Sequence, residues 1–153
     1  MATYPLRLDP RFRTTLYAVA SALAVTGVAW LLVDRLKPIY LMETWQRAAA
    51  YLLMLHGGAA MLMLLLLGAI IPMHVAVAWR RGKNRVTGSM MVVSNAMLIA
   101  TAFALYYSGS ETWRHQASVL HIGFGLGLPL LWALHVWRGK RTVQGLPRSA
   151  LRR

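Results

Sequence analysis

Four long runs without any Asp, Glu, Lys or Arg constrain this chain more than any other feature. They cover residues 14–33, 48–79, 86–110 and 115–137. Each run has the roughly 20 residues that a helix needs to cross about 30 Å of hydrocarbon. None carries a polar stripe wide enough for a water-exposed helix face, so a soluble helical bundle is the weaker alternative. The runs predict an all-α integral membrane protein, a bundle of four transmembrane helices.

The run lengths also predict the bounds of the helices. We expect one domain with helices at about 15–33, 45–80, 89–107 and 112–137, followed by a basic cytoplasmic tail over 138–153. Because Arg7 and Arg11 precede an apolar stretch with the Ala-rich sequence ASALA, the first run also resembles a cleaved secretory signal. We expect a retained helix, which has only Ser21 and Thr26 as polar residues and would serve as packing scaffold.

The distribution of basic residues predicts the orientation. The chain has 17 Lys and Arg against 4 Asp and Glu, a formal net charge of +13. Thirteen of the basic residues lie in the first 13 positions, in the segment 80–85 and after Trp137, whereas the other two loops hold four. The positive-inside rule therefore places both termini and the middle loop in the cytoplasm, with the chain in a bacterial cytoplasmic (inner) membrane. This pattern favours anionic lipid of the bilayer over nucleic acid as a partner.

All five histidines lie in two of the predicted helices, which run in the same direction. At 100° per residue, His56 and His74 share one face of the second helix, about 27 Å apart. His121 and His135 nearly share one face of the fourth, about 21 Å apart. Imidazole is a common axial ligand of haem iron. The pattern predicts an outer haem held by His56 and His121 and an inner haem held by His74 and His135, with the near-surface His115 as an alternative outer ligand.

Cysteine is absent, which excludes covalent c-type attachment, so both haems would be non-covalently bound haem b. Cations and glycines near the histidines are candidate contacts of these haems. Propionates need cations, and small residues allow a macrocycle to approach the backbone. The candidate propionate contacts are Arg47, Arg114, Arg80, Arg81 and Arg138, and the candidate close approaches are Gly57 and Gly125. The same arginines are also typical snorkelling anchors, and glycines also serve helix packing.

The sequence LHIGFGLGLPLLWALHVW, with fourteen residues from His121 to His135, accompanies LHGG at His56 and PMHVAVAWRRGK around His74. Together they resemble the membrane-embedded dihaem cytochrome b subunits that anchor bacterial respiratory oxidoreductases. The resemblance covers residues 15–140, although the second helix spaces its histidines by eighteen residues rather than fourteen. It implies two b haems passing electrons across the membrane between a periplasmic redox subunit or c-type cytochrome and quinone or another acceptor.

The expected role is therefore a non-catalytic electron-transfer subunit of a larger membrane complex, with quinone reduction or quinol oxidation left open. One alternative is a cofactor-free anchor or assembly subunit whose histidines only join helices. Another is a small transporter or metal-ion carrier that uses the same histidines. The lack of carboxylates within the predicted spans weakens this last reading, because coupled transport usually needs a titrating acid.

Overall fold

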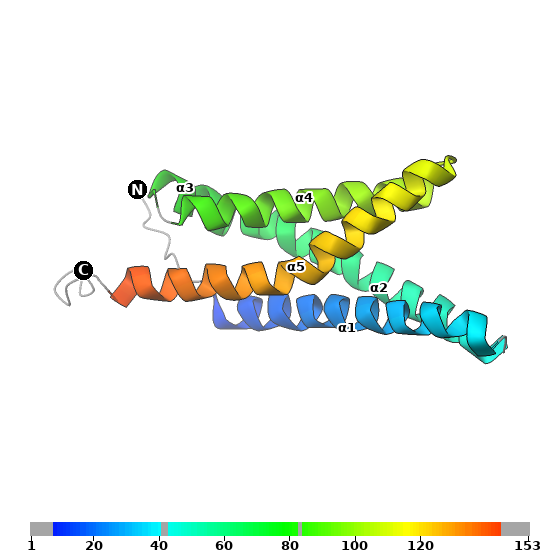
Figure 1. Cartoon of the computed structure of the whole chain (residues 1–153). Coiled ribbons are helices and arrows are strands. Elements are labelled where there is room, and N and C mark those ends of the chain that lie inside the picture. The colour runs from blue at the N-terminus through cyan, green and yellow to red at the C-terminus, as the bar shows by residue number, and fades with distance from the viewer. Residues whose placement is uncertain (1–7, 41–42, 83, 145–153) are drawn as a thin grey trace. The chain divides into compact units, whose positions relative to one another are not determined.

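The computed structural model describes residues 8–40, 43–82 and 84–144, and every element within them is helical (Figure 1). The elements are α1 (Pro10–Tyr40), α2 (Glu43–Ile70), the π-helix η1 (Ile71–Val75), α3 (Ala76–Arg80), α4 (Arg85–Tyr107) and α5 (Glu111–Gln144). Because α2, η1 and α3 follow one another without a break, the described residues form four continuous helical segments. Each is long and apolar enough to span a membrane, which confirms the all-α class and the four predicted spans.

Two of the helices extend well beyond the predicted bounds. α1 begins at Pro10 rather than near residue 15, because Asp9 caps it: the Asp9 Oδ1 atom accepts hydrogen bonds from the backbone N–H groups of Arg11 (2.9 Å) and Phe12 (3.3 Å). Pro10 suits the first helical position, where no N–H is needed. α5 continues to Gln144, so the first part of the predicted tail is helical, and residues 145–153 lie outside the described residues. The prediction ended the helix where charged side chains end the apolar run. Lys and Arg are good helix formers, so the helix continues through them.

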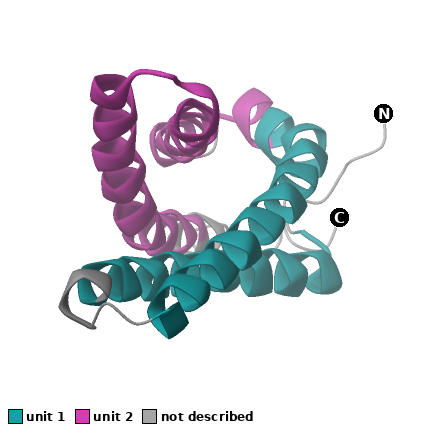
Figure 2. Cartoon of the chain, turned by 90° about the vertical axis from the view of Figure 1, so that its right-hand side faces the viewer, with its two compact units in different colours: residues 1–77 teal, residues 78–153 magenta. Residues whose placement is uncertain are grey.

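The chain divides into two compact units, residues 1–77 and 78–153 (Figure 2). In the first unit α1 packs against α2, and in the second unit α4 packs against α5. The helices of each pair are joined by a short connection and run antiparallel, so each unit is a helical hairpin. The boundary between the units falls within α3.

A π-helical turn interrupts the second span at the predicted position of its bend. Pro72 has no N–H, and in a regular α-helix its ring would crowd the carbonyl of Gly68. The chain instead forms η1, closed by a hydrogen bond from the Ala76 N–H to the Ile71 carbonyl five residues earlier. A π turn rotates the chain less per residue than an α turn. His74 is therefore rotated away from the position that 100° per residue predicts relative to His56.

The turn between α3 and α4 is fixed by one arginine. The Arg85 guanidinium donates two hydrogen bonds to the Trp79 carbonyl, of 3.1 Å and 2.9 Å, and lies 5.3 Å from the centre of the Trp79 ring. Gly82 and Asn84 have positive φ values of 65° and 48°, which reverse the chain. A Cβ atom at Gly139 would lie 3.4 Å from Asn84 Nδ2, so the far part of α5 packs closely against this turn.

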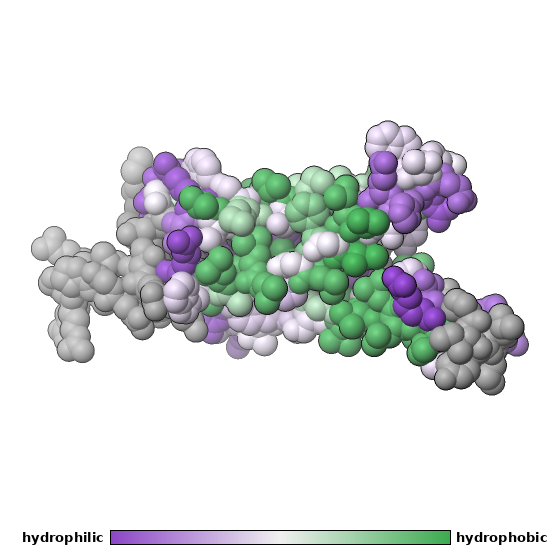
Figure 3. Space-filling view, in the orientation of Figure 1, coloured by the Kyte–Doolittle hydropathy of each residue, from purple (hydrophilic) through white to green (hydrophobic). Residues whose placement is uncertain are grey.

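Apolar side chains cover much of the surface of the helices. Large residues such as Leu65 and Leu130 are 74% and 75% exposed, whereas few apolar side chains of the described residues are buried. Figure 3 shows hydrophobic residues along the middle of the helices and hydrophilic residues near their ends. In water such exposure would be unfavourable, but in a bilayer lipid covers these side chains. α5 also changes direction midway (Figure 1), in keeping with the predicted bend at Pro129 inside it.

Candidate functional site

In the first unit, His56 of α2 is bonded to a threonine of α1. The His56 Nδ1 atom lies 3.0 Å from Thr26 Oγ1, and this hydroxyl also lies 2.6 Å from the carbonyl oxygen of Ala22 in its own helix. A hydroxyl has one proton, and the short contact with the carbonyl takes it. This geometry favours the tautomer in which His56 donates its Nδ1–H to Thr26 and carries its lone pair on Nε2.

A glycine next to this threonine makes room for the imidazole ring. A Cβ atom at Gly27 would lie 3.2 Å from His56 Cε1, which is closer than ordinary van der Waals contact, and 3.5 Å from its Nδ1 atom. The absence of a side chain at Gly27 thus lets the ring of His56 lie directly against the backbone of α1. We call the pair Thr26–Gly27 the α1 seat of His56.

In the second unit, His121 of α5 makes the same bond to α4. Its Nδ1 atom lies 2.9 Å from Thr101 Oγ1, and that hydroxyl donates to the carbonyl of Met97 at 2.7 Å. Thr101 is buried, so water does not compete for the bond. As with His56, this geometry favours the tautomer with the proton on Nδ1 and the lone pair on Nε2.

His135, farther along α5, bonds to Thr87 near the start of α4. Its Nδ1 atom lies 3.0 Å from Thr87 Oγ1, and Thr87 is only 2% exposed. The Thr87 hydroxyl is 3.4 Å from the Asn84 carbonyl, beyond the usual range of an O–H···O bond, so it can either accept from His135 or donate to it. Gly88 follows Thr87 as Gly27 follows Thr26, and a Cβ atom there would lie 4.0 Å from His135 Cε1.

The two bonds of the second unit share one register. Fourteen residues forward along α5, from His121 to His135, correspond to fourteen residues back along α4, from Thr101 to Thr87. Ser94 lies midway, and these three small hydroxyl residues are the buried residues of α4. A spacing of seven residues is close to two helical turns. α4 therefore presents one stripe of hydroxyl groups, two of which bond the histidines of α5.

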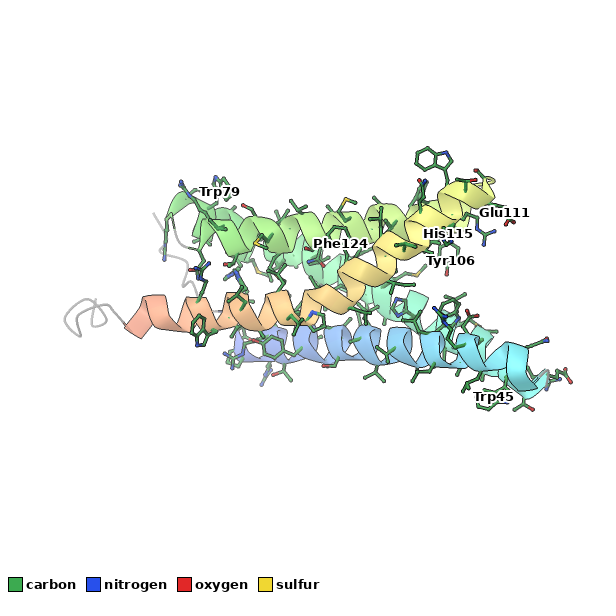
Figure 4. All side chains as sticks on the ribbon, in the orientation of Figure 1. Trp45, Trp79, Tyr106, Glu111, His115 and Phe124 are labelled. Carbon is green, nitrogen blue, oxygen red and sulfur yellow. The ribbon has the colours of Figure 1, made fainter. Side chains whose placement is uncertain are left out.

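The remaining histidines lie in different settings. His74 is half-buried in η1, and π turns are frequent at functional sites. His115 is exposed near the α4–α5 turn, at the same end of the unit as Glu111 and Tyr106 (Figure 4). The structure thus gives His121, rather than His115, a bond to the neighbouring helix.

The predicted cation and glycine contacts are located near helix ends or at helix contacts. Arg47 forms an exposed ion pair with Glu43 at 2.7 Å, and such pairs contribute little to stability. The other candidate arginines, Arg80, Arg81, Arg114 and Arg138, are exposed. Gly57 is half-buried beside His56, while a Cβ atom at Gly125 would lie 3.9 Å from Leu98 of α4, where the glycine serves hairpin packing. Their contacts with haem stay predictions.

The residues that hold the imidazoles are not among the predicted site residues. The first helix, expected to serve as packing scaffold, supplies Thr26 and Gly27, which contact His56. Two signals were present in the sequence: the dipeptide Thr-Gly occurs at 26–27 and at 87–88, and small hydroxyl residues recur at seven-residue spacing in α4.

The three bonds have one chemical consequence, which is a set of imidazoles oriented through Nδ1 by hydroxyl groups of the neighbouring helix. Ligating histidines in proteins are commonly oriented in this way through their second nitrogen. The donor set therefore fits a group that binds neutral imidazole through Nε2. Comparison of the chain with protein-family models, with curated proteins and with solved structures found no match.

Proposed function

We propose that this chain is a dihaem b-type membrane cytochrome that passes electrons across the bacterial cytoplasmic membrane. The observation that carries the proposal is the orientation of His56, His121 and His135, each bonded at Nδ1 to a threonine of the neighbouring helix. In a histidine whose Nδ1 carries the proton, Nε2 is the nitrogen that can ligate a metal. Bound haem would supply a reversible one-electron couple of iron.

Four histidines would hold the two haems. His56 and His121 would ligate the outer iron, and His74 and His135 the inner one. The fourteen residues between His121 and His135 separate the two levels by about 21 Å along α5. The hydroxyl stripe of α4 supports both imidazoles of α5 in one register, which keeps them at fixed depths.

The partners follow from the proposed orientation. With both termini and the basic turn at 80–85 in the cytoplasm, the α1–α2 and α4–α5 connections face the periplasm. A periplasmic redox subunit or c-type cytochrome would exchange electrons with the outer haem. Quinone or another acceptor would be the other redox partner of the chain, within a larger membrane complex.

A cofactor-free anchor or assembly subunit is the second candidate, and the same bonds favour it. Interhelical hydrogen bonds of polar side chains stabilise membrane hairpins by about 0.6 kcal/mol on average and up to about 1.7 kcal/mol. Such a role needs the His–Thr bonds but makes no demand on Nε2. The two candidates therefore differ in haem content and not in the hairpin geometry.

Haem stoichiometry separates the two candidates. We expect the purified chain to show a reduced-minus-oxidised spectrum of b haem and a pyridine haemochrome assay of two haems per chain. A chain that binds no haem when haem is supplied during expression would overturn the proposal and favour the anchor.

Single substitutions test the assignment of the ligands. His56→Leu and His121→Leu should each lower the content from two haems to one, with the same haem lost in both variants. The matched control is His115→Leu on the same helix, which should keep two haems. Loss of haem in His115→Leu but not in His121→Leu would reject His121 as the ligand.

A further inference from the structure

We infer that the hydroxyl groups of Thr26 and Thr101 are positioning groups that set the midpoint potential of the outer haem, and that Thr87 acts in the same way on the inner haem. The inference rests on the proposed function, because it assigns each threonine to a haem through its histidine. It adds three residues that do not touch the iron but act on it through His56, His121 and His135.

The first step is the direction of the hydrogen bonds. Thr26 and Thr101 each donate their single proton to a carbonyl of their own helix, at 2.6 Å to Ala22 and 2.7 Å to Met97. The oxygen lone pairs remain for the imidazole, at 3.0 Å and 2.9 Å. Both threonines are therefore acceptors only, and both histidines are held as the Nδ1–H tautomer.

The side chains of Thr26 and Thr101 are held in a fixed orientation by their own helices. A threonine in a helix commonly bonds the carbonyl three or four residues before it, which holds its side chain in one rotamer. Thr26 and Thr101 make the short bond to the residue four before, and the carbonyls three before lie at 3.3 Å and 3.2 Å, so each hydroxyl proton points toward its own helix. The acceptor lone pair is thus aimed at the neighbouring helix before any ligand binds.

The third step is the effect on iron. An imidazole that donates its Nδ1–H to an oxygen carries more negative charge on the ring and is a stronger electron donor through Nε2. Stronger donation stabilises ferric iron relative to ferrous iron and lowers the midpoint potential, and hydrogen bonding around the ligands is one of the ways a protein tunes haem. Removing the acceptor should therefore raise the potential.

The hydroxyl of Thr87 differs from those of Thr26 and Thr101 in its bond to its own helix. Its hydroxyl is not committed to a carbonyl at short distance, so it accepts from His135 only when His135 carries its proton on Nδ1. Ligation of iron through Nε2 requires that tautomer. The same substitution at Thr87 should therefore act on the haem that His135 ligates and not on the haem of His56 and His121.

The test is a redox titration of the holoprotein and its variants, followed through the absorbance of each b haem. Thr26→Val and Thr101→Val replace the hydroxyl by a methyl group of similar size. Each should raise the midpoint potential of one and the same haem, and Thr87→Val should raise that of the other. Thr26→Ser and Thr101→Ser retain the hydroxyl and should keep the wild-type potential.

The matched control is Thr14→Val, an exposed threonine of α1 whose hydroxyl donates to the Pro10 carbonyl. It should shift neither haem. Unchanged potentials in all three test variants would overturn the inference, as would equal shifts in the serine variants. Shifts of different haems by Thr26→Val and Thr101→Val would overturn the assignment of both threonines to one haem.

Failure of the proposed function can be distinguished from failure of the inference about the threonines. A wild-type chain without haem rejects the function, and the tautomer of His56 and His121 is then read from their side-chain ¹⁵N resonances in detergent micelles. Protonated Nδ1 is expected, with a change of tautomer in Thr26→Val and Thr101→Val. Protonated Nε2 in the wild type would overturn the inference about the threonines as well.

Discussion

A Cβ atom at Gly27 would lie 3.2 Å from Cε1 of His56. This relationship joins the two helices of the first unit at the point where Thr26 bonds the same imidazole. The Nδ1–Cε1 edge of the ring therefore meets both the hydroxyl of Thr26 and the bare backbone of Gly27. A side chain at residue 27 would have to displace the ring or separate the helices.

Gly27→Ala should accordingly weaken the first hairpin, although alanine is favoured over glycine in helices by up to about 1 kcal/mol. Overpacking a close contact costs about 1–3 kcal/mol, so we expect a net loss of about 1 kcal/mol in unfolding free energy in detergent. Thermal unfolding measures this loss. The controls are Gly88→Ala, where the new Cβ atom would make an ordinary 4.0 Å contact, and Gly58→Ala, where it would meet open space. Equal stability of all three variants would contradict the claim that the ring of His56 needs a glycine at residue 27.

Pro72→Ala tests the π turn. Restoring the N–H allows a hydrogen bond to the Gly68 carbonyl, which removes the reason for the wider turn. His74 would then rotate about the helix axis, and we expect the inner haem to be lost or spectrally altered while the outer haem is retained. Haem assay and redox difference spectra measure the outcome. Gly68→Ala, in open space on the same span, should retain both haems. Two unaltered haems in Pro72→Ala would show that the π turn does not position His74.

Arg85→Lys should destabilise the second unit. A lysine cannot donate two hydrogen bonds in the fork geometry that joins Arg85 to the Trp79 carbonyl, and it loses part of the contact with the indole ring. Cation–π contacts at exposed sites are worth about 0.5–1 kcal/mol, and we expect a total loss of about 1 kcal/mol. Chemical unfolding in micelles measures it. Arg114→Lys, an exposed arginine on α5, should stay within about 0.5 kcal/mol of the wild type.

The topology can be tested with single cysteines, because the chain has none of its own. Ser110→Cys, between α4 and α5, should react with a membrane-impermeant maleimide in cells whose inner membrane is intact. Arg81→Cys, between α3 and α4, should react only after that membrane is permeabilised. The physical reason is the concentration of basic residues at the termini and in the 80–85 segment. The reverse labelling pattern would place the termini in the periplasm.

The spans were predictable because they depend on local composition. A run of twenty or more residues without charge can bury its backbone in lipid only by satisfying its own hydrogen bonds, and a helix does so within one segment. The ends of the helices were harder to predict from the sequence. α1 begins five residues early because Asp9 and Pro10 start a helix outside the apolar run, and α5 continues through the arginines after Trp137.

The histidines were predictable as candidates because ionisable groups are costly in hydrocarbon and draw attention in an apolar sequence. Both histidines of α5 lie in one α-helix and bond threonines of α4 that are also fourteen residues apart. The spacing in the second span did not follow the same rule. Pro72 predicted a bend, but the π turn that changes the rotation of His74 depends on how the chain relieves the clash with Gly68.

Sequence alone determined that this chain has four helices fit for a membrane and that two of them carry paired imidazoles. Only the tertiary structure decided which hydroxyl holds each imidazole. The partner of a polar side chain depends on which helix packs beside it and in which register, and neither is encoded within the segment itself. Thr26, Thr87 and Thr101 look like ordinary small residues of apolar helices until hairpin packing brings each within 3.0 Å of a histidine nitrogen.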